Sequence, residues 1–137
     1  MAWEKPKCMG DVPAKRSGHS FTVVGSMGYL FGGVPQKRPP GPTNDLFKLD
    51  MSNAGEFYWQ KVKPPPSSGS GQKWPAPRWF HSASVYAKTN LVVFGGFFSS
   101  GVRFNDLWIL DTSNGDRWSQ PQPGQTDEGE DGVWMRI

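Results

Sequence analysis

The chain has 137 residues, a length that ordinarily forms one domain with a core of moderate size. Only 36% of the residues are hydrophobic, whereas 17 glycines, 13 prolines and 7 tryptophans favour short strands with many turns and argue against a helical protein. The net charge is +3, but residues 1–126 carry 14 basic and 8 acidic residues, or +6, because four acids gather near the C-terminus. Most such charges form a solvated surface, although a basic body also suits an acidic partner.

A single cysteine, Cys8, excludes an internal disulfide, and the N-terminus lacks the basic and apolar segment of a secretory signal. The longest apolar stretches, such as residues 91–94, fall far short of the roughly 20 residues that a membrane-spanning helix needs. These features predict a soluble protein of a reducing compartment. The cytoplasm is the expected location, and the nucleus is the alternative.

The first elements along the chain are short strands. Residues 1–10 contain a tryptophan and have the pattern of an edge strand that belongs to a preceding structural unit. Residues 11–63 then form a first complete unit, in which alternating apolar residues and punctuating glycines predict four antiparallel strands. These strands cover residues 19–24, 29–31, 45–49 and 57–62.

The second unit repeats the first after an insertion rich in Pro, Ser and Gly at residues 64–74. Within residues 75–122 the segment Pro75-Ala76-x-Arg78-x-x-His81-Ser82 repeats Pro13-Ala14-x-Arg16-x-x-His19-Ser20, and Phe94-Gly95-Gly96 repeats Phe31-Gly32-Gly33. Four further segments of the first unit, from Asn44-Asp45-Leu46 to Trp59, also recur in the same order. Their counterparts in the second unit are Asn105-Asp106-Leu107, Leu110-Asp111, Ser113-Asn114 and Trp118. Self-similarity of this kind indicates a solenoid or a propeller. The predicted strands of this unit cover residues 82–86, 91–94, 106–110 and 117–120.

These linked motifs resemble the kelch repeat, which runs from an Arg-x-x-His segment through a double glycine to an Asn-Asp-Leu strand and a late tryptophan. The resemblance covers residues 11–122 and implies an all-β fold. The expected structure is a kelch-type β-propeller segment of two four-stranded antiparallel blades, plus an edge strand of a preceding blade. The second unit departs from the first where Trp79-Phe80 replaces Ser17-Gly18, and this leaves the loop geometry of the second blade open.

Two units fall short of the three or more repeats that stability generally requires, and of the about 4 to 8 blades that close a propeller. Residues 123–137 are predicted to be an acidic tail or the start of the next linker. We therefore expect the sequence to be part of a longer propeller, and assembly of short chains is the alternative.

The most regular residues of the two units are expected to be structural. Paired glycines allow backbone conformations that are closed to residues with a Cβ atom. The late tryptophans, with Trp3 as their N-terminal counterpart, would bury aromatic area between blades, and the aspartates after the third strands would accept hydrogen bonds from turn amides. The histidines are expected to point into their own blades. This structural set contains His19, Gly32, Gly33, Asp50, Trp59, His81, Gly95, Gly96, Asp111 and Trp118.

Catalytic and metal-binding motifs are absent from the sequence. It has no nucleophile elbow, no phosphate-binding glycine loop and no H-E-x-x-H motif. The fold also occurs in copper oxidases similar to galactose oxidase, but one cysteine and two repeat histidines do not match that ligand set. The sequence therefore predicts no catalytic residue, no metal site and no cofactor.

Binding is expected in the loops, because rigid scaffolds commonly present recognition residues there. Residues 34–41 are basic and rich in proline, residues 97–103 offer aromatics and an arginine, and an arginine precedes the first strand of each unit. Arginine and aromatic residues are enriched at interface hot spots, and such a surface would suit an acidic or phosphorylated peptide. The predicted partner-binding residues are Arg16, Lys37, Arg38, Arg78, Trp79, Phe80, Phe97, Phe98 and Arg103. The alternative is that the aromatics pack within the blade and the cations are merely solvated.

Three functions are compatible with these features. A protein–protein interaction or scaffolding module is favoured, because it needs only the repeats and variable loops. The alternative is a targeting or regulatory propeller of a larger enzyme, such as a kelch-containing serine/threonine phosphatase. Nucleic-acid binding, suggested by the basic body and the aromatics, is the least favoured of the three.

Overall fold

A computed structural model describes residues 1–66 and 73–121 of the chain. The described residues form strands, turns and loops without a helix, so the all-β prediction is confirmed. Accordingly, the described residues contain no helix that is long and apolar enough to span a membrane. The predicted acidic tail and most of the Pro/Ser/Gly-rich insertion lie outside the described residues.

The first blade contains the four strands that the sequence predicts. They are β3 (Ser20–Val24), β4 (Met27–Phe31), β6 (Leu46–Asp50) and β7 (Glu56–Val62). Each pairs in antiparallel fashion with the next one along the chain, so the spatial order from the inner edge outwards is β3-β4-β6-β7. The β3–β4 connection is tight because Gly25 adopts a positive φ of 61°, which glycine reaches without steric cost.

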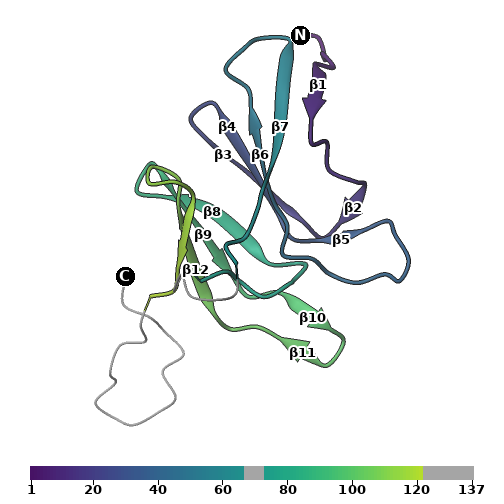
Figure 1. Cartoon of the computed structure of the whole chain (residues 1–137), viewed down its shortest axis with the longest axis vertical. Coiled ribbons are helices and arrows are strands. Elements are labelled where there is room, and N and C mark those ends of the chain that lie inside the picture. The colour runs from purple at the N-terminus through teal and green to yellow at the C-terminus, as the bar shows by residue number, and fades with distance from the viewer. Residues whose placement is uncertain (67–72, 122–137) are drawn as a thin grey trace.

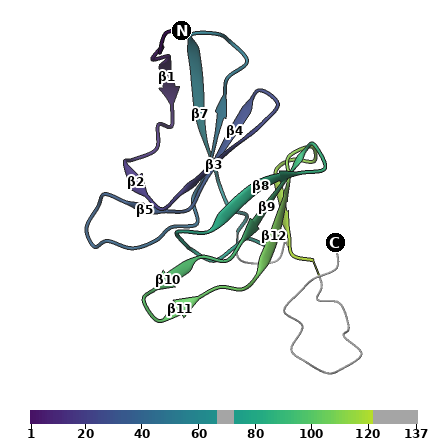
Figure 2. The same cartoon turned by 180° about the vertical axis from the view of Figure 1, so that it is seen from behind.

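The second blade repeats this arrangement. Its strands are β8 (Ser82–Tyr86), β9 (Asn90–Phe94), β12 (Leu107–Asp111) and β13 (Arg117–Ser119), again antiparallel and in the order β8-β9-β12-β13. The two sheets stand side by side, with β3 of the first blade next to β8 of the second (Figures 1 and 2). Their register makes the blades directly comparable residue by residue.

The N-terminal segment differs from the expectation. Strand β1 (Lys7–Gly10) pairs in parallel with β7, so it adds a fifth strand to the outer edge of the first blade instead of standing in a preceding one. Gly10 fits this position because a Cβ atom there would lie 2.2 Å from the carbonyl oxygen of Trp59. Trp3, which we expected to be buried between blades, is fully exposed.

Each blade also carries a short ribbon that sequence analysis does not predict. In the first blade β2 (Arg16–Ser17) pairs with β5 (Val34–Pro35). In the second blade β10 (Phe97–Ser99) pairs with β11 (Val102–Arg103), and Trp79 forms an isolated bridge with Phe97 that corresponds to the Ser17–Val34 pair. Both ribbons project from the same side of the molecule (Figures 1 and 2).

The main core lies between the two blades. Tyr29, Phe31 and Leu46 of the first blade face the second, and all three are nearly or fully buried there. Trp118 meets them from the second blade, with its ring centre 5.0 Å from that of Phe31. Burial of this apolar area stabilises the pair of blades, at roughly 25 cal/mol per Å². The remaining members from the second blade are Leu91, Val93, Trp108 and Leu110.

A polar cluster completes the contact between the blades. The Tyr29 hydroxyl donates a hydrogen bond of 2.9 Å to Asp116, and the Lys48 ammonium lies 2.8 Å from the other carboxylate oxygen of Asp116. Burial, followed by the nearby Asp116 carboxylate, raises the pKa of Tyr29. The hydroxyl therefore stays protonated and continues to donate.

His81 crosses between the blades instead of pointing into its own. Its Nε2 atom lies 2.8 Å from the Ser20 hydroxyl, and its ring centre lies 5.2 Å from that of Phe31. Burial lowers the pKa of His81 to about 4, and the charges of Arg78 and His19 act in the same direction. The expectation that each histidine packs within its own blade is therefore wrong for His81. His19 is exposed.

The double glycines and the turn aspartates have local geometries that account for their residue types. All four glycines have positive φ values of 69° to 99°, and a Cβ atom on Gly33 or Gly96 would lie within 3.0 Å of neighbouring backbone. Asp50 accepts hydrogen bonds from the amide and hydroxyl of Ser52, and Asp111 accepts the same pair from Ser113. These bonds lower the pKa of Asp50. They also close each turn after the third strand of its blade.

Candidate partner-binding surface

Two of the four predicted interface arginines, Arg16 and Arg78, lie inside the protein. The Arg78 side chain has no exposed surface, and that of Arg16 is 4% exposed. Each arginine donates a hydrogen bond to the carbonyl oxygen of the first glycine of a double glycine and forms a salt bridge with the aspartate just before the third strand of the blade. Neither side chain is available to a partner, so we assign both to the scaffold and correct the predicted partner-binding set.

Arg78 makes the tighter of the two arrangements. Its guanidinium binds both carboxylate oxygens of Asp106, at 2.6 and 2.9 Å, and donates to the carbonyl oxygens of Gly95 and Ala76. The centre of the Phe104 ring lies 4.2 Å from the guanidinium carbon of Arg78. Burial alone would raise the pKa of Asp106, but the hydrogen bonds from Arg78 and Trp108 outweigh it and hold this pKa below its usual value.

Two aromatic residues, Trp79 and Phe80, follow the buried Arg78 directly in the sequence and belong to a cluster of aromatic side chains. Trp79 stacks on Phe80 with 4.4 Å between ring centres, and Phe97 meets Phe80 edge-on at 6.4 Å. Arg103 places its guanidinium 5.4 Å from the centre of the Phe97 ring. We call Trp79, Phe80, Phe97 and Arg103 the aromatic cluster. Two backbone hydrogen bonds between Trp79 and Phe97 hold the two segments together.

Phe80 has an unusual backbone conformation. Its φ is +56°, in the left-handed region that bulky residues rarely adopt, and Gly18 has a φ of +71° at the equivalent place in the first unit. The second loop therefore keeps the geometry of the first in spite of its aromatic residues. The Phe80 amide donates to the carbonyl oxygen of Gly18, which ties the two loops together. As a result the Phe80 side chain is held outwards and is 59% exposed.

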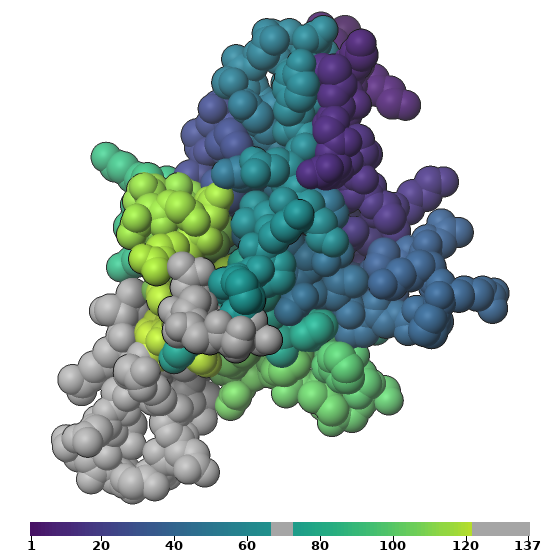
Figure 3. Space-filling view, in the orientation of Figure 1, coloured from purple at the N-terminus to yellow at the C-terminus, as the bar shows by residue number. Residues whose placement is uncertain are grey.

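The other predicted binding residues are at the surface. Phe98 follows Phe97 in β10 and is 47% exposed, and Lys37 and Arg38 lie exposed in the loop after β5. Figure 3 shows this loop of the first blade and the β10–β11 hairpin of the second projecting on the same side of the molecule. The structure thus brings Trp79, Phe80, Phe97 and Arg103 into direct contact, whereas Lys37 and Arg38 lie in the loop that follows the ribbon of the first blade.

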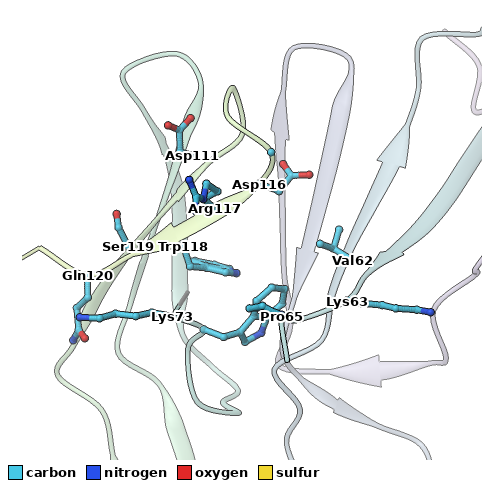
Figure 4. A pocket seen from close by; sticks show the side chains of 12 residues that line it. Val62, Lys63, Pro65, Lys73, Asp111, Asp116, Arg117, Trp118, Ser119 and Gln120 are labelled. Atoms are coloured by element: carbon cyan, nitrogen blue, oxygen red, sulfur yellow. The ribbon is translucent and has the colours of Figure 1, made fainter. Parts of the chain in front are cut away.

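A pocket in the described residues lies elsewhere and has different properties. It has a volume of about 500 Å³ and opens between the end of β7 and β13, with Trp118 in its wall. Lys63 and Lys73 at its edges extend in opposite directions, so they do not converge on a common ligand (Figure 4). Residues 1–66 and 73–121 also contain no group of three or more His, Cys, Asp or Glu side chains that could hold a metal ion.

Sequence reasoning missed the scaffold role of the arginines, although the sequence contained a signal for it. Arg16 and Arg78 recur at the same repeat position, just as Asp45 and Asp106 do, and a pair of opposite charges that recurs together in both units is a signal of an ion pair within the blade. The aromatic pair, by contrast, is found at the position where the units differ. The candidate binding surface is therefore smaller than the set of residues that the sequence predicts.

Comparison with known proteins agrees with the architecture. Residues 1–132 match the family model described as the KLHDC2/KLHL20/DRC7 Kelch-repeats domain. The flagellar outer-arm dynein alpha chain of Chlamydomonas reinhardtii is 38% identical over 109 residues, which cover 79% of this chain and 2% of the relative. Human host cell factor 1 is 37% identical over 124 residues, which cover 82% of this chain and 6% of the relative.

A third relative is dynein regulatory complex subunit 7 of Chlamydomonas reinhardtii, which is 40% identical over 109 residues. These cover 79% of this chain and 8% of the relative, so the chain spans only a small part of each of these proteins. The family match covers nearly the whole chain, and it agrees with the repeated four-stranded sheets and the buried double-glycine and arginine sites. The chain therefore belongs to the kelch-repeat family.

Proposed function

We propose that this chain is a protein-interaction module that binds a partner through the aromatic cluster and the adjoining loops. The observation that carries the proposal is Phe80, which is 59% exposed and is held in a left-handed conformation that its side chain disfavours. Backbone strain of this kind costs about 1 to 3 kcal/mol and tends to occur at functional sites. A contact between the Phe80 ring and a partner would explain why an exposed aromatic residue is kept at this strained position.

An acidic or phosphorylated peptide is the partner that fits this surface. Arg103 lies in the aromatic cluster, and Lys37 and Arg38 are exposed in the loop after β5, which projects on the same side of the molecule. Guanidinium groups bind carboxylates and phosphates through paired hydrogen bonds, while the aromatic rings supply contact area at low entropic cost. The net charge of +6 over residues 1–126 would also speed the approach of an acidic segment.

Two relatives are named as a dynein chain and a subunit of a dynein regulatory complex, and both names refer to multi-protein assemblies. By analogy with these two relatives, the proposed role of this chain is to hold other proteins together. The proposal includes no catalysis by these residues, and a catalytic domain elsewhere in a longer protein would be compatible with it. A cytoplasmic or nuclear location stays a prediction.

Peptide binding by the purified chain tests this function. The probes are fluorescent peptides rich in phosphoserine and glutamate, together with lysine-rich peptides of the same length. Fluorescence polarisation should show binding of the acidic set, and Arg103→Glu or Phe80→Ser should weaken it at least about tenfold, as hot-spot residues do. Val12→Ser is the matched control because Val12 is 58% exposed and lies outside the cluster.

Two results would contradict the proposal. If the acidic peptides bind equally well to the wild type and both cluster variants, this surface is not the binding site. If the acidic and lysine-rich sets bind alike, or if neither binds, the assignment to an acidic partner fails.

A further inference from the structure

Each blade has a broad face that the described part of the chain leaves uncovered. On the second blade this face presents Tyr86 and Phe94, which are 42% and 40% exposed. We call it the second-blade face, and its other apolar members are Val92, Leu107 and Ile109, all half-buried. The first-blade face lies at the opposite end of the pair and consists of Phe21, which is 45% exposed, with the half-buried Phe57 and Trp59.

The contact between the two blades of one chain provides a template for both faces. Strand register makes Phe94 equivalent to Phe31, which the second blade covers almost completely. In the same way Trp59 is equivalent to Trp118, which does the covering. The second-blade face therefore corresponds to the covered side of the observed contact, and the first-blade face corresponds to the covering side.

Chemical complementarity is preserved although the residues change. In the observed contact Tyr29 and Lys48 both bind Asp116. On the second-blade face, Val92 is equivalent to Tyr29 and Ile109 is equivalent to Lys48. On the first-blade face, Phe57 is equivalent to Asp116. A trio of polar residues in one contact thus becomes a trio of apolar residues in the other, so neither pair of faces would bury an unpaired charge.

Shape is preserved by a similar exchange. Phe21 lies over Gly28, where a Cβ atom would come within 2.4 Å of its ring. The second blade reverses the sizes, with Ala83 and Leu91 at the two equivalent positions. Total side-chain volume is kept, and volume-conserving exchanges of this kind are well tolerated in packed contacts.

We propose that the second-blade face of one chain docks on the first-blade face of a second copy, in the relative orientation that the two blades of a single chain adopt. The contact joins two different faces, so it generates closed rings when the rotation per chain closes. A propeller of about 4 to 8 blades then requires two to four copies of a two-blade chain.

The mass of the full chain in solution tests the proposal. Size-exclusion chromatography with light scattering should give a discrete species of two to four chains, each of 15.2 kDa. Ile109→Lys should give a monomer, because its lysine would be buried against Phe57 without a partner, and Phe57→Asp should give a monomer for the reciprocal reason. Val12→Asp makes a similar change at an exposed residue outside both faces and should leave the mass unchanged.

Mixing the two variants makes the test specific. The lysine of Ile109→Lys then meets the aspartate of Phe57→Asp in the arrangement that Lys48 and Asp116 already have within one chain. The mixture should regain the wild-type mass, and this recovery would also show that both variants fold. If either variant alone is unfolded by circular dichroism, the reversed pair Ile109→Asp with Phe57→Lys replaces it, with the same expected pattern.

Three outcomes would overturn the proposal. A wild-type chain that stays monomeric up to the highest soluble concentration would show that these faces do not bind a second copy. A wild-type oligomer that survives both substitutions would use another surface. An oligomer that is lost in the variants but not recovered by mixing would exclude the proposed orientation.

Discussion

The first and second units place an arginine at the same repeat position, but the two sites differ in strength. Arg78 donates two short hydrogen bonds to Asp106 and is completely buried. Arg16 approaches Asp45 at 3.5 Å, and Asp45 is shared with Lys61 at 3.6 Å. Equivalent positions therefore keep one role, which is to join the double glycine to the third strand, while the local geometry sets how much each contributes.

The same comparison separates scaffold from surface. Where the units are identical, as at the arginines and the double glycines, the residues are buried or conformationally constrained. Where they differ, as at Ser17-Gly18 and Trp79-Phe80, the side chains reach solvent or the neighbouring blade. Substituting equivalent positions in the two units measures this difference directly.

Loss of the arginine should produce the largest difference. Arg78→Ala removes a buried partner from Asp106 and is expected to reduce the free energy of unfolding by about 3 kcal/mol or more. Arg16→Ala loses weaker bonds and should cost about 2 kcal/mol. Urea denaturation followed by tryptophan fluorescence compares them. Equal losses at the two positions would mean that the bidentate geometry at Arg78 adds nothing.

Lowering the pH should reduce the free energy of unfolding chiefly through His81, the histidine of the second unit. Because the pKa of His81 is lowered to about 4 in the folded chain, the unfolded chain binds a proton between pH 6.5 and pH 4 that the folded chain does not. The contribution of neutral His81 to the free energy of unfolding is therefore complete above pH 6.5 and is lost as the pH falls towards 4. The difference of roughly 2.5 between the two pKa values corresponds to about 3 kcal/mol.

The histidine test uses thermal melting at several pH values. His81→Gln should flatten the dependence between pH 6.5 and pH 4, whereas Val12→Gln, which changes an exposed residue without a titratable group, should leave it unchanged. An unchanged slope in His81→Gln would show that another group is responsible. Asp106 acts at lower pH, since its pKa lies below the usual value and its contribution is lost only as the pH falls through that value.

The polar cluster between the blades should give a smaller effect. Asp116→Asn keeps an acceptor for Tyr29 but removes the charge that pairs with Lys48, so a loss of about 1 kcal/mol is expected. Asparagine is also tolerated at the positive φ of 54° that Asp116 adopts. Glu4→Gln removes an exposed charge and is the control. Equal chemical denaturation midpoints for the two variants would contradict a role for Asp116 between the blades.

The strands could be predicted because their signals are local. Alternation, tight turns and double glycines lie within each strand and its neighbours, and the predicted ranges agree with the observed strands to within about two residues. Repetition of the landmarks then gave the number of strands in each unit. Chain order alone was sufficient, since each strand pairs with its successor.

The features that sequence reasoning missed depend on contacts between distant residues. Arg78 and Asp106 are 28 positions apart, and arginine is exposed in most proteins, so composition favoured a surface role. His81 reaches Ser20 across the contact between the blades, at a separation of 61 residues. The parallel pairing of β1 with β7 likewise has no local signal. Such contacts become visible only when the two sheets are placed side by side.

The smallest stability effect is expected at Phe80, and it separates stability from binding. Phe80→Gly relieves a left-handed conformation that costs roughly 1 to 2 kcal/mol. It also loses the stacking on Trp79 and adds freedom to the unfolded chain, which together cost a similar amount. The free energy of unfolding should therefore stay within about 1 kcal/mol of the wild type, while acidic peptides bind more weakly.

The first unit provides the reciprocal substitution. Gly18→Ala introduces a Cβ atom 3.0 Å from that of Trp79 at a positive φ of 71°, and should cost about 1 to 2 kcal/mol. Urea denaturation compares the two variants with the wild type. If Phe80→Gly destabilises the chain more than Gly18→Ala does, the aromatic ring is part of the scaffold and the case for its role in binding loses its main support. The opposite order would mean that stability does not require the exposed ring, as expected for a residue retained for binding.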